Sequence, residues 1–147
     1  MNVVQMNQLL QEHIPLCAFM QLKIISLSAN AIATTAPLAP NQNMHGTGFA
    51  GAQYSLAVAT GWALVHNRLD EAGVKGQLVV KEATIHYKRP VTGDLELNAC
   101  FHDSVIAEDT LVQELSELGR VKFPLIVNIY SNGKKCGYLD ASYIVVA

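Results

Sequence analysis

The stretch NQNMHGTGFAGAQYSLAVATGWALV, Asn41 to Val65, places a polar, glycine-containing segment directly before a long apolar run. No formally charged residue occurs from Gly48 to Val65, and small residues, chiefly alanine and glycine, recur along the run. We expect a helix from about Phe49 to about Ala72, because apolar residues lie on nearly every side of it and Gly73 supplies a natural stop. The stretch therefore predicts a buried helix that opens from a polar loop.

The uncharged run approaches the length of a membrane span. Its composition argues against that use, since it is rich in alanine and glycine and contains Gln53, Ser55 and Thr60. A helix that is apolar all round can equally be buried in protein. We therefore expect no contact with a membrane.

The segments around this helix show strand and helix patterns. Alternating apolar residues predict strands, and Asn132-Gly133 offers the positive-φ residues of a tight hairpin turn. A short helix with leucines at helical spacing is also expected. The predicted elements are a helix at Gln5 to His13, strands at Leu22 to Ser28, Ala31 to Pro37, Gln77 to Arg89 and Leu95 to Phe101, a helix at Glu108 to Leu118, and strands at Val121 to Ile129 and Lys135 to Val146.

This order of elements predicts an α+β fold in a single domain, residues 1–147. An antiparallel sheet wrapped around one long buried helix covers every side of that helix, and this arrangement is the hot dog fold. One copy would leave a sheet edge and the helix start partly uncovered. We therefore expect a homodimer or a dimer of dimers.

Composition excludes several classes of function. Ten lysines and arginines against twelve acidic residues give a net charge of -2, and no basic block exceeds Lys134-Lys135, so no nucleic-acid partner is expected. Three cysteines without a CxxC pair favour a reducing compartment, and we expect a cytoplasmic protein. The histidines show no metal-binding spacing, and the chain contains no dinucleotide or phosphate-loop fingerprint. No metal or cofactor is expected.

The pre-helix segment resembles a known family. NMHGTGFAG, Asn43 to Gly51, is similar to the form N-x-x-G-T-x-H-G-G of PaaI-type acyl-CoA thioesterases, where L-A-D follows. Leu56-Ala57 keeps that register, and Ile85-x-Tyr87-x-x-Pro90 resembles the third strand of the superfamily. The same loop, followed by Thr60-Gly61-Trp62, is more similar to the thioesterase domain of the YiiD C-terminal type. The resemblance covers most of the chain.

The resemblance implies roles for two residues of the loop and helix start. Asn43 stands where the family's asparagine helps to bind the thioester or the attacking water. Ala50 stands at the first glycine of HGG, whose backbone N–H meets the thioester oxygen. Two positions depart from the pattern, since Phe49 replaces the histidine and Val58 replaces the aspartate that acts as base or nucleophile. The usual carboxylate is therefore missing.

Another group must then activate water if the protein is a thioesterase. Glu82 is one candidate, since strand parity sets it opposite Ile85 and Tyr87, where it would face the helix of a partner subunit. His45 is the other, because imidazole transfers protons readily near neutral pH. Each residue also has a structural interpretation: Glu82 as a solvent-facing group, His45 as a partner of the loop backbone.

The remaining candidates surround the helix start. Thr47, Phe49, Gly51 and Gln53 are predicted to contact substrate, although a buried glutamine is commonly satisfied by backbone groups. The predicted function is hydrolysis of an acyl thioester at a dimer-interface site, with acyl-CoA as the favoured substrate and an acyl-carrier thioester as the other. The alternative is a non-catalytic module of the same fold that binds acyl-CoA or a fatty acyl group, which Val58 favours.

Overall fold

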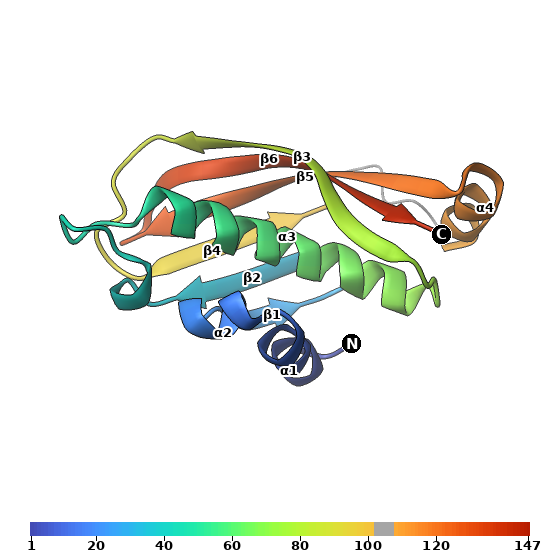
Figure 1. Cartoon of the computed structure of the whole chain (residues 1–147), viewed down its shortest axis with the longest axis horizontal. Coiled ribbons are helices and arrows are strands. Elements are labelled where there is room, and N and C mark those ends of the chain that lie inside the picture. Colours follow the sequence, from blue (N-terminus) through green and yellow to red (C-terminus); the bar gives the residue numbers. More distant parts are fainter. Residues whose placement is uncertain (102–107) are drawn as a thin grey trace.

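The computed structural model describes residues 1–101 and 108–147. Its helices and strands alternate as the sequence predicts, with two short helical segments in addition, α2 and η1 (Figure 1). In chain order the elements are α1 (Val3–His13), α2 (Pro15–Met20), β1 (Lys23–Leu27), β2 (Ala31–Ala36), the 3-10 helix η1 (Ala39–Asn41), α3 (Ala50–Glu71), β3 (Gln77–Tyr87), β4 (Leu95–Cys100), α4 (Glu108–Leu118), β5 (Arg120–Ser131) and β6 (Lys134–Val146).

The strands form one six-stranded sheet in the order β1-β2-β4-β5-β6-β3. Every pairing between neighbouring strands is antiparallel. The sheet curves around α3, and α1 and α2 lie beside α3 at the β1 end of the sheet (Figure 1). The predicted hot dog fold, an antiparallel sheet wrapped around one long buried helix, is confirmed.

The 22-residue helix α3 supplies the centre of the core. Leu56, Ala57, Ala63 and Leu64 on α3 have no exposed surface. In the described part of the chain, no helix is long and apolar enough to cross a membrane. The uncharged part of α3, up to Val65, is largely buried in the core.

Gly61 permits the closest contact between α3 and the sheet. A Cβ at this position would collide with the ring of Tyr143 on β6, whose hydroxyl donates a hydrogen bond to the Val58 carbonyl at 2.8 Å. Burial raises the pKa of the Tyr143 phenol. A helix-interior glycine costs about 1 kcal/mol relative to alanine, and the close tyrosine contact explains why it stands there.

The hairpin between β5 and β6 turns as its sequence predicts. Asn132 and Gly133 both have positive φ, 51° and 75°, as a two-residue turn of this kind requires. The Asn132 side chain donates to the Thr92 hydroxyl at 2.9 Å. The turn is therefore tied to the segment between β3 and β4.

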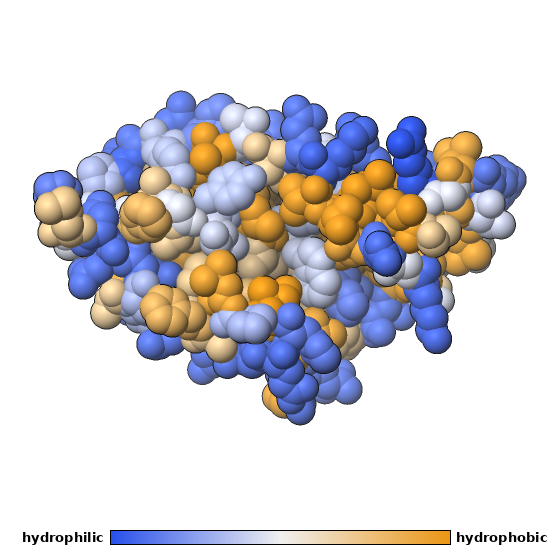
Figure 2. Space-filling model, in the orientation of Figure 1, coloured by the Kyte–Doolittle hydropathy of each residue, from blue (hydrophilic) through white to orange (hydrophobic). Residues whose placement is uncertain are grey.

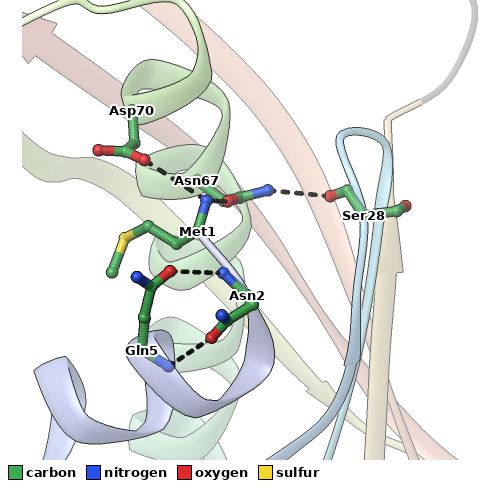
Figure 3. Close-up of polar contacts among 6 residues, drawn as sticks. All are labelled: Met1, Asn2, Gln5, Ser28, Asn67 and Asp70. Atoms are coloured by element: carbon green, nitrogen blue, oxygen red, sulfur yellow. Dashed lines mark hydrogen bonds and ion pairs between the residues drawn. The ribbon is translucent and has the colours of Figure 1, made fainter.

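The beginning of the chain is fastened to the C-terminal half of α3 (Figure 3). The Met1 amine donates to Asn67 Oδ1 at 2.9 Å and lies 3.4 Å from a carboxylate oxygen of Asp70. Asn67 Nδ2 in turn donates to the Ser28 carbonyl, at 3.2 Å. Asn2 then caps α1 by accepting from the Gln5 backbone. These contacts fix α1, and with it the position of α2 beside α3.

Candidate active site

The segment between Gln42 and Gly48 forms a tight loop in front of α3. Gln42 and Gly48 form an isolated antiparallel bridge that closes it. Inside the loop, Asn43 N–H donates to the Thr47 carbonyl at 2.7 Å and Gly46 N–H donates to the Asn43 carbonyl at 3.2 Å. Gly46 has φ +77°, a conformation that favours glycine. The loop is therefore held by its own backbone.

The side chain of Asn43 organises this loop. Its Oδ1 accepts from the backbone N–H groups of His45, at 2.9 Å, and Thr47, at 3.1 Å. Its Nδ2 donates to the Thr47 hydroxyl at 2.9 Å. Asn43 thereby fixes the backbone of His45, which is exposed. In this structure the asparagine positions the loop, and the His45 imidazole is the group presented to solvent.

The start of α3 presents backbone N–H groups without a side-chain cap. Phe49 occupies the N-cap position in an extended conformation and makes no capping hydrogen bond through its side chain. The first residues of the helix, Ala50 and Gly51, are exposed. The first N–H groups of a helix have no partner within it, and the helix dipole adds positive potential there. This geometry suits the negative oxygen that forms when a thioester carbonyl is attacked.

The Phe49 side chain lies directly beside this helix start. A Cβ built on Gly51 would approach the Phe49 ring to 2.8 Å, so the ring packs where a side chain at position 51 would lie. Phe49 is nevertheless 53% exposed. The aromatic ring therefore lies beside the helix start while about half of its own surface stays exposed. A bound group could pack on that exposed surface.

Two buried amides support the loop from below. Gln53 Nε2 donates to the Gly48 carbonyl at 3.0 Å, and Asn41 Nδ2 donates to the carbonyls of Met20 and Pro37. The backbone carbonyl of Asn41 accepts from the Phe49 N–H at 2.8 Å. Oδ1 of Asn41 and Oε1 of Gln53 are buried and have no hydrogen-bond partner in the described structure. Gln53 therefore supports the loop through its Nε2, while its Oε1 stays a buried acceptor.

Tyr87 joins the helix start to β3, a contact that our sequence reasoning did not assign. Its hydroxyl donates to the Ala50 carbonyl at 2.7 Å. Burial, and then the neighbouring Tyr54, raise the pKa of Tyr87. The signal was present in the sequence, because Tyr87 belongs to the strand motif quoted above, but a motif match does not say which backbone atom a side chain reaches.

Glu82 lies away from these residues. It pairs with Ser142 on β6, whereas the next residue, Ala83, pairs with the buried Ala141 on the face that packs against α3. A β-bulge between Val80 and Glu82 sets this register. Glu82 is therefore on the solvent face of the sheet, as its alternative interpretation holds, and the protomer does not bring it together with Asn43, His45 and Ala50.

An apolar groove runs from the helix start along α3. A cavity of about 380 Å³ lies between α2 and the first turns of α3 and is bordered by Phe49 and Gly51. A second cavity, of about 230 Å³, continues to Trp62 and is lined by Val58. Val58, which stands where the PaaI-type sequence pattern has an aspartate, thus forms part of an apolar wall.

The described residues contain no cluster of three or more histidine, cysteine or acidic side chains that would suit a metal ion. His102 lies outside the described residues. The three cysteines, Cys17, Cys100 and Cys136, are free thiols.

Comparisons with known proteins identify the family and the fold. A model of the family described as "Putative thioesterase (yiiD_Cterm)" matches residues 3–147. A solved structure of a "putative thioesterase" from Shewanella oneidensis is 31% identical, with a TM-score of 0.86 over 99% of this chain and 97% of that chain. A "probable thioesterase" from Pseudomonas aeruginosa is 26% identical, with a TM-score of 0.84 over 99% and 96%. The Escherichia coli PaaI protein, 15% identical, shares the fold with a TM-score of 0.73 over 99% and 94%. The chain belongs to the YiiD C-terminal family of thioesterases.

Proposed function

We propose that the protein hydrolyses an acyl thioester at the N-terminus of α3. The thioester is that of an acyl-CoA or of an acyl group on a carrier. The observation that carries this proposal is the uncapped start of α3, which lies between an ordered polar loop and the mouth of an apolar groove. A thioester needs the same two surroundings, because its carbonyl becomes negatively charged during attack while its acyl chain seeks apolar surface. Membership of a thioesterase family supports the assignment.

The backbone N–H groups of Ala50 and Gly51 would stabilise the developing oxyanion. Loss of one such donor typically costs about 3 to 4 kcal/mol of transition-state stabilisation. The Phe49 ring would pack against the thioester, since it is exposed beside Gly51. Asn43 and Thr47 would keep the loop in shape through their mutual hydrogen bonds, and Gln53 holds the loop from below.

His45 is our candidate for the general base. It lies in the same loop as Asn43 and is exposed, whereas Glu82 lies on the face of the sheet that points away from α3. The His45 imidazole would take a proton from water as the water oxygen attacks the carbonyl carbon. Collapse of the tetrahedral intermediate breaks the C–S bond, and the departing thiolate recovers that proton, so the products are a carboxylic acid and a thiol.

Assembly would complete the site. β3 lies at the end of the sheet and has eleven residues, so among the described residues one long edge has no partner strand. Unpaired edges of this length readily accept another strand. We propose that β3 pairs with β3 of a second copy, which extends the sheet and places the two helix starts at one dimer interface. A dimer of dimers remains compatible with this pairing. We also propose a cytoplasmic location, because the three cysteines of the chain are free thiols.

A non-catalytic acyl-binding module is the second candidate. One observation favours it, because Val58 lines an apolar groove at the position of the family's catalytic carboxylate. The groove would then bind an acyl chain, and its described lining contains no carboxylate equivalent to the base of PaaI-type enzymes.

A turnover panel separates the two functions. Wild-type protein, His45→Gln, Glu82→Gln and the control His13→Gln, another exposed histidine, would be assayed with acyl-CoA and acyl-carrier thioesters of several chain lengths. We expect wild type, Glu82→Gln and His13→Gln to hydrolyse at least one thioester and His45→Gln to lose at least about 100-fold in kcat/KM. Binding without turnover by wild type would eliminate the hydrolase proposal. Loss of turnover in Glu82→Gln alone would identify Glu82, facing the helix of a partner subunit, as the base instead of His45.

A further inference from the structure

We propose that Tyr54 is a further residue of the site, whose phenol hydroxyl donates a hydrogen bond to the carbonyl oxygen of the substrate. This inference rests on the proposed function, because that function places the oxygen at the backbone N–H groups of Ala50 and Gly51. It adds a side-chain donor to a site whose other donors to this oxygen belong to the backbone.

Tyr54 lies on the same side of α3 as the exposed residues of the helix start. It follows Ala50 by four residues and Gly51 by three, and residues at these spacings are neighbours on the surface of a helix. Long side chains of a helix lean toward its N-terminus and cover the preceding turn. We therefore expect the Tyr54 phenol to extend toward Ala50 and Gly51.

Two other phenols indicate where the Tyr54 ring lies. The Tyr87 hydroxyl donates to the Ala50 carbonyl at 2.7 Å, and the Tyr143 hydroxyl donates to the Val58 carbonyl at 2.8 Å. These carbonyls belong to the residues four positions before and four positions after Tyr54. Burial is the larger cause of the raised pKa of both Tyr87 and Tyr143, and the nearby Tyr54 phenol is the second cause in each case. The Tyr54 ring therefore lies near both phenols and near the carbonyls that they bind.

Of these three hydroxyls, that of Tyr54 is the one left free. In the described part of the chain, hydrogen bonds hold the hydroxyls of Tyr87 and Tyr143 on carbonyls of α3, and no residue binds the hydroxyl of Tyr54. Tyr54 is only partly buried, and it lines the cavity of about 230 Å³ that Val58 and Trp62 also line. A phenol at a cavity wall without a protein partner is available to donate to a ligand.

The surroundings make a single donor effective. Figure 2 shows apolar side chains gathered where α2 faces α3, and no charged residue lines the cavity that Tyr54 borders. A hydrogen bond in such surroundings is stronger than in water. A donor aimed at the oxygen that becomes negative stabilises the transition state more than the bound thioester. Tyr54 keeps its own proton in this step, and the proton of the attacking water still passes through His45 to the departing thiolate.

Tyr54→Phe tests this role because it removes only the hydroxyl. We expect kcat for dodecanoyl-CoA to fall at least about 100-fold, the usual effect of losing one oxyanion donor, while KM changes less than about threefold. The Tm should be unchanged or higher, because the hydroxyl has no hydrogen bond to lose within the described part of the chain. A kcat within about threefold of wild type would overturn the proposal.

Tyr130→Phe is the matched control. Tyr130 is another partly exposed tyrosine, on β5, and it does not belong to the lining of the cavity. We expect this variant to equal wild type in kcat, KM and Tm. The loss in Tyr54→Phe then follows from the position of the hydroxyl and not from the removal of a phenol in general.

Infrared spectroscopy tests the contact without turnover. The probe is an analogue of dodecanoyl-CoA in which a methylene group replaces the sulfur, so that its isotopically labelled carbonyl is a ketone that cannot be hydrolysed. A hydrogen bond to this carbonyl lowers its stretching frequency. We expect the frequency of the bound probe to be lower in wild type and in Tyr130→Phe than in Tyr54→Phe. Equal frequencies in all three proteins would contradict the contact.

The outcomes separate this inference from the proposed function. A frequency shift that depends on Tyr54, without any turnover by wild type, would keep Tyr54 as the residue that binds the carbonyl and reject the hydrolase. Full turnover by Tyr54→Phe, with the frequency of wild type, would keep the hydrolase and reject the role of Tyr54. Light scattering covers the remaining partner of the hydroxyl, since a change from dimer to monomer in Tyr54→Phe would show that it binds a second copy of the chain and would overturn the proposal.

Discussion

Replacement of Asn43 by alanine should impair catalysis far more than folding. The amide makes three hydrogen bonds within the loop, two from its Oδ1 to backbone N–H groups and one from its Nδ2 to Thr47. In Asn43→Ala the loop loses all three, while its backbone bridge between Gln42 and Gly48 can persist. The His45 backbone would then be held less firmly relative to the start of α3.

The expected magnitudes follow from the exposure of the loop. Its N–H groups can recover hydrogen bonds from water, so three bonds at about 1 kcal/mol each overstate the loss, and we expect about 1 to 2 kcal/mol, as for a lost helix cap. For a chain of this size that lowers Tm by roughly 2 to 4 °C per kcal/mol. Misplacement of a catalytic group by about 1 Å can cost on the order of 100-fold in rate. We therefore expect kcat/KM to fall about 100-fold.

Two further variants make the measurement decisive. Asn2→Ala removes the cap of α1, where Asn2 Oδ1 accepts from Gln5 N–H at 2.8 Å, and should lose similar stability with unchanged kcat/KM. Asn43→Asp keeps the acceptor for the N–H groups of His45 and Thr47 and should recover most of the rate. The assay follows release of the CoA thiol from dodecanoyl-CoA, with Tm measured on the same samples. If Asn43→Ala lost stability but kept kcat/KM within threefold of wild type, the loop would be a structural cap alone.

Three other predictions concern assembly, a turn and pH. Light scattering should find a dimer or tetramer, and a monomer that persists at high concentration would remove the interfacial site. Gly133→Val should lower the free energy of unfolding by about 1 to 2 kcal/mol, since φ of 75° disfavours a β-branched residue, and an unchanged Tm would contradict the observed turn. Burial lowers the pKa of His66, with Asp70 opposing that shift and the N-terminal amine adding to it. The unfolded chain therefore binds more protons below about pH 6.5, so stability should fall as pH drops through that range. His66→Gln should show a shallower loss between pH 7.5 and 5, and an identical pH dependence in both proteins would show that His66 does not contribute.

The fold was predictable because several independent signals coincide in the sequence. Alternation predicts β5 and β6, the Asn132-Gly133 turn predicts their antiparallel pairing, and a long helix that carries no charge up to Val65 requires a cover on nearly every side. The short helix α2 was not predicted, because six residues are too few for a periodic pattern. Pro15 marks its start only as a break after α1. That omission concealed the groove, since α2 forms one of its walls.

The places of the candidate residues in the fold were predictable where local backbone geometry determines them and uncertain where a strand face determines them. Local sequence alone is enough to place Asn43 in a loop and Ala50 at the start of a helix. The face of Glu82 depends on a bulge beside Val80, and a single extra residue moves every following side chain to the other face of a strand. Sequence parity placed Glu82 opposite Ile85 and Tyr87, as observed, but it could not say which of those faces meets a helix.

The apolar character of the groove accounts for an uncharged residue at position 58. A carboxylate at position 58 would project into an apolar cavity that also buries the Cys17 thiol, and the burial of a charge in such surroundings is strongly unfavourable unless it is paired. With valine at this position an acyl chain can pass from the helix start to Trp62 without meeting a charge on that wall of α3. Under the proposed function, the proton transfer that the carboxylate performs in PaaI-type enzymes would come from outside the groove, and the exposed loop that Asn43 holds in shape carries His45. Under the proposed function, the apolar wall of the groove and a base on the loop would therefore both follow from Val58.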